Sequence, residues 1–147
     1  MNVNRRTTTV LAIIVVILIA VFAITRWQHN LATRKLLADL PGDDYAKVLD
    51  AMTQLKERGH SITPALLDGE HLTSPLAPAR WRSATLLGDV GTRAAWDPLK
   101  QALGDESAEV RAAAALALGK LGARDAQTEL QARVTDAEED PAVRVNA

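Results

Sequence analysis

The apolar residues of this chain follow two patterns, and each predicts helices of a different kind. Residues 7–25 carry no charge, and the 15 residues from Val10 to Ile24 are all apolar. Beyond residue 42, apolar residues recur three or four positions apart, with charged and polar residues between them. A continuous apolar run predicts a helix surrounded by lipid, whereas the 3–4 spacing predicts amphipathic helices with one buried face.

The uncharged run is long enough to cross a membrane. Its 19 residues would form a helix of about 28 Å, close to the ~30 Å hydrocarbon core of a bilayer. Arg26 and Trp27 follow the run directly, where interfacial side chains flank a span. The sequence therefore predicts a tail at 1–6 and a transmembrane helix at 7–27, with Arg26 and Trp27 at the membrane interface.

A cleaved secretory signal peptide is the alternative interpretation of this run, with Val21-Phe22-Ala23 as a weak cleavage site. The apolar region would lie at the upper limit of the roughly 7–15 residues usual for signal peptides. Basic residues flank the run almost evenly, so the positive-inside count is nearly level. The short tail favours a cytoplasmic N-terminus, with the C-terminal domain outside the cytoplasm, or in the periplasm of a bacterium.

Residues 28–60 predict a juxtamembrane helix followed by a leading helix. No Gly or Pro precedes Pro41-Gly42, so the membrane helix is expected to continue up to that pair. Asp43 or Asp44 can cap a second helix that runs to about Arg58. We expect these two helices to form a degenerate repeat that caps the array behind them.

Residues 61–147 repeat themselves with a period of 31–33 residues. Moved by 31 residues, Arg80 and the residues after it fall on Arg111 and its successors. Moved by 33, residues 107–111 fall on 140–144. A period in the low thirties with paired helices is typical of an α-solenoid. The last repeat is cut short, so its final helix is expected to be a two-turn stub.

Within this region the sequence predicts a short helix at about 64–71, a longer one that ends near Val90, and helices at 94–103, 107–121, 125–135 and from Pro141 onward. The core of this part is expected to include nine apolar residues: Leu86, Leu87, Leu99, Leu103, Val110, Ala114, Leu118, Leu121 and Leu130.

The best-formed copy, V-R-A-A-A-A-L-A-L-G-K-L-G at 110–122, resembles the HEAT-like repeats of the phycobilisome-lyase type. The residues that carry the match are Val110, Arg111, Ala114, Ala115, Ala117, Leu118, Gly119, Leu121 and Gly122. The first repeat departs from this pattern at Pro78 and Ala79. The resemblance implies an all-α fold, a short HEAT-like solenoid of stacked helix pairs behind a single transmembrane helix.

Composition and motifs argue against several functions. The chain has 17 Lys and Arg against 18 Asp and Glu and no Cys, which argues against nucleic-acid binding and excludes disulfides and thiolate metal sites. His29, His60 and His71 lack the spacing of metal ligands. No serine stands in a G-x-S-x-G motif. We therefore expect no enzyme activity, no cofactor, no metal and no small-molecule substrate.

Three arginines, Arg80, Arg111 and Arg144, recur at one place in the repeat. They could form an anion site along the array, or a ladder in which each binds turn carbonyls or an Asp, such as Asp105 or Asp136. Recurrence at the repeat period favours the ladder, because a contact between adjacent repeats must recur at that period.

Five residues are candidates for contacts with a partner protein: Trp81, Arg82, Trp96, Val143 and Val145. Trp81 takes the place of Ala112 on a side that repeats usually leave in solvent, and Trp and Arg are enriched at binding hot spots. Packing of Trp81 on the preceding helix pair is the alternative. Trp96 starts a helix and is expected to pack against Leu99 or a loop. Val143 and Val145 lie on the short last helix, where little is expected to cover them.

These observations predict a non-catalytic, membrane-anchored protein-interaction module. Its expected role is that of an accessory subunit or assembly and scaffold factor, bound to the lipid bilayer and to a larger integral membrane protein complex. The alternative, which comes from the resemblance alone, is a bilin-lyase-like protein that handles a chromophore.

Overall fold

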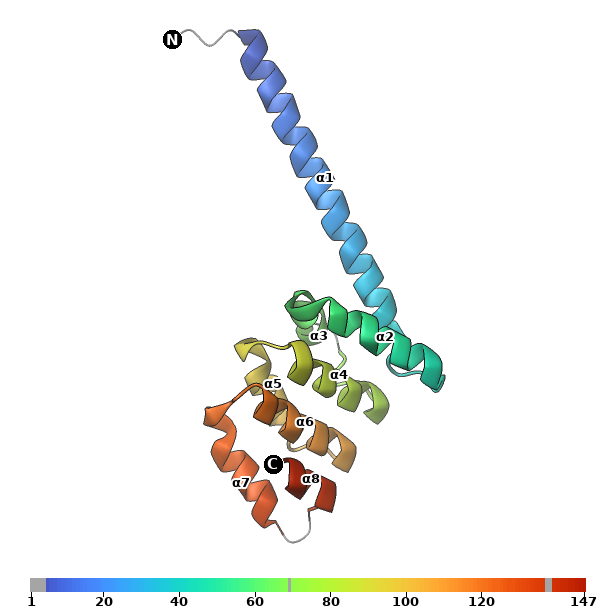
Figure 1. Ribbon diagram of the computed structural model, residues 1–147, viewed down its shortest axis with the longest axis vertical. Coiled ribbons are helices and arrows are strands. Elements are labelled where there is room, and N and C mark those ends of the chain that lie inside the picture. Colours follow the sequence, from blue (N-terminus) through green and yellow to red (C-terminus); the bar gives the residue numbers. More distant parts are fainter. Residues whose placement is uncertain (1–4, 69, 137–138) are drawn as a thin grey trace. The chain divides into compact units, whose positions relative to one another are not determined.

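The computed structural model describes residues 5–68, 70–136 and 139–147. These residues form α-helices and short 3₁₀ helices and no strand, which confirms the predicted all-α fold (Figure 1). The chain divides into two compact units, Met1–Thr33 and Arg34–Ala147.

The first unit consists of most of α1 (Arg5–Ala38), which is one uninterrupted helix. Its side chains from Val10 to Leu31 are all exposed. Among the described residues, one helix, Val10–Ala38, is long and apolar enough to cross a membrane, and none of its most apolar window is buried within the protein. A signal sequence near the N-terminus would have the same length and composition.

The second unit contains the end of α1 and seven further helices among the described residues. These are α2 (Tyr45–Glu57), α3 (Thr63–Asp68), α4 (Ala77–Val90), α5 (Trp96–Ala102), α6 (Ala108–Lys120), α7 (Gln127–Thr135) and α8 (Pro141–Asn146). The helices lie within a few residues of their predicted positions. The helix expected at 64–71 is shorter and ends at Asp68, directly before Gly69, a residue type that is unfavourable inside helices.

Local chemistry explains where these helices begin and end. The side chains of Asp44, Ser107 and Asp140 accept hydrogen bonds from backbone N–H groups in the first turns of α2, α6 and α8. Such bonds satisfy amide donors that have no partner inside the helix. Gly59 and Gly122 follow α2 and α6 with φ of 58° and 61°, a left-handed conformation that glycine adopts without strain.

The helices pack as successive pairs in the order of the sequence (Figure 1). The second helices of the pairs form one continuous row, since α2 contacts α4, α4 contacts α6, and α6 contacts α8. The first helices, α3, α5 and α7, pack against α4, α6 and α8 respectively. Each pair therefore buries its apolar face against its neighbours, as repeat packing requires.

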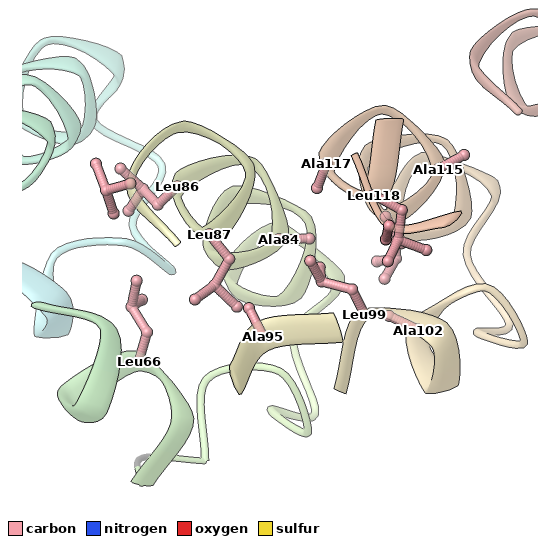
Figure 2. Packing of buried hydrophobic residues seen from close by; sticks show 14 of the residues in the cluster. Leu66, Ala84, Leu86, Leu87, Ala95, Leu99, Ala102, Ala115, Ala117 and Leu118 are labelled. Carbon is pink, nitrogen blue, oxygen red and sulfur yellow. The ribbon is translucent and has the colours of Figure 1, made fainter. Parts of the chain in front are cut away.

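The core lies between the two rows of helices, where Leu87, Leu99 and Leu118 point inward (Figure 2). Seven of the nine residues predicted for the core are buried: Leu86, Leu87, Leu99, Leu103, Val110, Ala114 and Leu118. The other two, Leu121 and Leu130, pack against the core but are only partly buried. Leu130 lies on α7, a helix with no fully buried side chain.

Helices α4 and α6 approach each other closely at Gly88 of α4. A Cβ atom at this position would lie 2.7 Å from Cα and 2.8 Å from Cβ of Ala117 on α6. Gly119 stands at the same place one repeat later, and nothing lies within 4 Å of its Cβ position. A side chain at Gly88 would therefore push two backbones apart, whereas one at Gly119 would not.

We expect Gly88→Ala to lower the free energy of unfolding by about 2 kcal/mol, because the added methyl group overpacks the α4–α6 contact. Gly119→Ala is the matched control and should leave stability unchanged or raise it by up to about 0.5 kcal/mol through helix propensity. Urea unfolding of the full chain in detergent, followed by circular dichroism, measures both. Equal effects of the two substitutions would show that the α4–α6 packing is assigned wrongly.

The side chain of Ser83 on α4 is fully buried, and its hydroxyl has no hydrogen-bond partner among the described residues. The corresponding residue of the next repeat is Ala114, which is equally buried. We expect Ser83→Ala to raise the free energy of unfolding by about 1 kcal/mol, since it removes an unsatisfied buried polar group. Ala114→Ser should lower it by a similar amount, and a stabilising effect of that reverse change would contradict the explanation.

Candidate functional site

Arg80, in the first turn of α4, is 6% exposed and joins two repeats. Its Nε and Nη2 donate to the two carboxylate oxygens of Asp105, both at 2.8 Å, and Nη2 also donates to Glu106 at 3.1 Å. Its Nη1 donates to the carbonyl oxygen of Ser74 at 2.8 Å. A guanidinium has five N–H donors, so little of this one remains for an external anion.

The charges of this pair stabilise each other. The hydrogen bonds to Asp105 raise the pKa of Arg80. Burial by itself would raise the pKa of Asp105, but the hydrogen bonds from Arg80 and from the N–H of Ser107 outweigh it, and the pKa is lowered. Both groups are therefore ionised at neutral pH.

Arg111 makes the corresponding contacts in the next repeat. Its Nε and Nη2 donate to Glu139, with Nη2 to Oε1 at 2.6 Å, and its Nη1 donates to the carbonyl oxygens of Asp105 and Glu106 at 2.8 and 3.0 Å. Arg111 thus binds turn carbonyls, as predicted, and its carboxylate partner is Glu139. Glu139 takes that role because its longer side chain is buried beside Arg111, whereas Asp136 is exposed.

The predicted arginine ladder is thus confirmed at two of its three positions. Arg80 and Arg111 bind turn carbonyls and carboxylates of adjacent repeats, which excludes the anion-site interpretation for them. Arg144, on α8, is exposed and forms no ion pair with any residue that the structure describes.

A second ladder joins the C-terminal ends of α2, α4 and α6. Asp89 binds Lys56 at 3.0 Å through one carboxylate oxygen and Lys120 at 2.7 Å through the other. Burial alone would raise the pKa of Asp89, but the hydrogen bonds from the two lysines outweigh it, and the pKa is lowered. The carboxylate therefore remains charged between two cations and links the three helices.

Two of the predicted contact residues pack within the fold. Trp96 is partly buried against the core, with the guanidinium of Arg93 4.9 Å from its ring centre. Arg82, expected on a free surface, instead donates from Nη1 to the carbonyl oxygens of Leu40 and Gly42. It holds the connection between α1 and α2, because those carbonyls lie beyond the last turn of α1 and need donors.

Trp81 occupies an intermediate position. Its ring packs against the core but remains partly exposed, and the Arg82 guanidinium lies 5.1 Å from the ring centre. A cation over an aromatic ring restrains both groups. The ring therefore presents a pre-positioned apolar edge to solvent.

The two valines of α8 differ in how much of each side chain is exposed. Val145 is 86% exposed, as predicted. Val143 is fully buried, so the expectation that little covers it was wrong. The reason is that α8 packs against both α6 and α7, which enclose the inward side of even a two-turn helix.

The exposed sides of α2 and α6 carry further apolar side chains that sequence reasoning missed. Leu49 is 52% exposed and Leu116 is 42% exposed, and Met52 is partly exposed. Met52 and Leu116 each lie one helical turn before the lysine that binds Asp89, which is Lys56 on α2 and Lys120 on α6. They therefore lie at the same level of the two helices. The sequence signal that could have identified them is that α6 is apolar on nearly every side. Such a pattern predicts a helix covered on every side.

We call this surface the outer face, defined by Leu49, Met52, Trp81, Ala112, Ala113 and Leu116, all partly or largely exposed. Its chemistry is that of an apolar contact surface.

Among the described residues, no group of three or more metal-ligating side chains comes together. His60 contacts the carbonyl oxygen of Val90 through Nδ1, and burial lowers the pKa of His71.

Comparison with known families adds one finding. The sequence model of a family described as HEAT repeats matches residues 63–147, more than half of the chain and the whole of α3 to α8. No curated protein matches the sequence.

The Arg111–Glu139 pair makes stability depend on pH. The hydrogen bonds from Arg111 lower the pKa of Glu139 below its ordinary value of 4.5. The pair therefore contributes its full stability above about pH 4.5 and loses it as the pH falls through the lowered pKa of the folded protein. We expect Glu139→Gln to cost about 2–3 kcal/mol at pH 7, because Arg111 loses its partner.

The test compares urea midpoints of the wild type and Glu139→Gln between pH 7 and pH 3. The difference between them should shrink as the pH falls. Glu129→Gln, at an exposed position of α7, is the control and should follow the wild type throughout. Parallel curves for Glu139→Gln and the wild type would contradict the assigned role of Glu139.

Proposed function

The chain belongs to the HEAT repeat family, and we propose on this basis that it is a non-catalytic protein-interaction module, anchored in a membrane and attached to a larger integral membrane complex. The observation that carries the proposal is the outer face. Leu49 and Leu116 are apolar yet 52% and 42% exposed, on α2 and α6, the two helices that flank α4 in one row. Exposed apolar side chains gathered on one row of helices mark sites where proteins associate.

The make-up of the outer face favours a protein partner. Trp81 is held in place by its packing and by Arg82, so it loses little freedom when a partner covers it. Ala112 and Ala113 leave a shallow surface beside it on which a partner helix can lie. Val145 corresponds to Trp81 and Ala112 by the repeat register and would extend the contact onto α8.

The helix pairs would act as a short α-solenoid, whose consecutive repeats offer one extended surface. Residues 7–27 would form the membrane anchor, with Arg26 and Trp27 at the interface and the repeats outside the cytoplasm. An anchor and an outer face that engage the same complex give two linked attachments, which strengthen binding beyond either one. The chain would then serve as an accessory subunit or assembly factor.

The bilin-lyase-like alternative gains no support, because the match is to HEAT repeats in general. A binding role requires only surface complementarity, and the outer face offers it without acid, base or nucleophile.

The test is co-purification of the tagged full chain with its partners in mild detergent. Leu49→Gln combined with Leu116→Gln should reduce the recovered complex at least tenfold, since about 1.4 kcal/mol of lost binding suffices for that. Leu76→Gln combined with Val134→Gln is the matched control, because those residues are 51% and 46% exposed at the N-terminal cap of α4 and on α7, and neither belongs to the outer face. It should leave the recovery unchanged.

Point substitutions are preferable to removal of α8, because Val143 and Glu139 are both buried and contact the rest of the array. Exchange of residues 7–27 for an unrelated transmembrane helix separates the two attachments. If the outer-face variant co-purifies like the wild type while the exchange abolishes association, the repeats are not the binding surface.

A further inference from the structure

A groove of about 850 Å³ opens between the connection from α3 to α4 and helix α5. Glu70 to Pro75 supply residues to one wall, and Pro98, Gln101 and the Asp105-Glu106 turn form the other. The groove lies where the first repeat differs from the second in the connection between its two helices. From Asp68 to Ala77 the chain takes a longer path between helices than the corresponding path from Ala102 to Ala108.

Arg80 lies at the base of the groove and fastens its walls together. It donates to the carbonyl oxygen of Ser74 on one wall and to Asp105 and Glu106 on the other. Because Arg80 is 6% exposed and the Asp105 side chain is 12% exposed, the bond between them is shielded from water. The groove is therefore a pre-formed feature of the repeat junction, and a ligand would not have to order its walls.

The ionisable lining of the groove is strongly unbalanced. It comprises four carboxylates and one guanidinium: Asp68, Glu70, Asp105, Glu106 and Arg80. Four hydrogen bonds already engage Arg80. Asp68 and Glu70 are exposed and form no ion pair with a described residue. The field in the groove therefore repels anions and attracts cations.

The lining of the groove also includes apolar side chains, and these limit which kind of cation fits the groove. Leu67, Leu72 and Pro98 lie beside the carboxylates. Lys and Arg side chains carry a charged head on an aliphatic stem that packs well on such surfaces. A bare metal ion or a fully hydrated small cation would leave these side chains unused.

We propose that this groove binds a basic peptide segment of a partner protein. Lysine or arginine heads lie beside Asp68 and Glu70, and their aliphatic stems pack on Leu72 and Pro98. The groove and the outer face are built from different residues, so the chain has a second contact that selects for charge. This contact does not depend on whether the outer face binds.

The experiment uses the full chain in micelles of an uncharged detergent at low salt. The probe is a fluorescein-labelled peptide of about ten residues in which lysine and alanine alternate, and binding is followed by anisotropy. We expect saturable binding that Asp68→Asn combined with Glu70→Gln weakens by about tenfold, because each lost carboxylate removes a favourable Coulomb contact. The same peptide with glutamate in place of lysine should not bind.

Asp43→Asn combined with Glu57→Gln is the matched control. It makes the same charge change at two exposed residues outside the groove and should alter the affinity less than twofold. An equal loss in both variants would show that net charge, not the groove, binds the peptide, and would overturn the proposal. So would absence of saturable binding, or complete displacement of the peptide by spermidine at equal charge concentration. None of these outcomes bears on the outer-face co-purification.

Discussion

The backbone contact between α4 and α6 at Gly88 and Ala117 sets the spacing on which the other interactions between the repeats depend. At this separation, Arg80 in the first turn of α4 reaches the Asp105-Glu106 turn before α6. Asp89, in the last turn of α4, reaches Lys120 in the last turn of α6. A wider spacing would break contacts at both ends of the helices at once, because each bond is short and directional.

The two ladders differ in kind. The arginine contacts are largely buried and bind backbone carbonyls as well as carboxylates, so they couple turn conformation to repeat packing. The lysine contacts with Asp89 are more exposed, with the Lys56 side chain 61% accessible, and exposed pairs contribute little to stability. The end of the helix row that carries the arginine contacts is therefore held more strongly than the end that carries the lysine contacts. The groove lies at the arginine end.

Much of this fold could be predicted from the sequence, because helix signals are local. Capping by Asp44 and Ser107 and the alanine-rich run of α6 act within a few residues of where they stand. The repeat period likewise predicted that Arg80 and Arg111 contact adjacent repeats. The repeat period alone could not predict which carboxylate binds Arg111. Glu139 and Asp136 are equally suitable until the path of the connection before α8 is known.

The surfaces were harder to predict, because exposure depends on which neighbour covers a helix. Arg82 and Trp81 are adjacent in sequence, yet Arg82 is occupied by the carbonyls of Leu40 and Gly42, while part of Trp81 stays in solvent. Leu116 belongs to an alanine-leucine helix that reads as buried on every side. The groove depends on a connection between helices, where periodicity carries no information.

The order of helix contacts also has a consequence for how the chain folds. Each second helix touches the one before it and the one after it, so the contacts join segments that are near in sequence. Proteins with such local contacts fold quickly, and arrays of this kind nucleate in one region and then propagate. The contact between α4 and α6 is the most extensive between any two helices, and alanine loses no side-chain entropy when it is ordered. These two helices are thus suited to form the nucleus on which α2 and α8 then assemble from opposite sides.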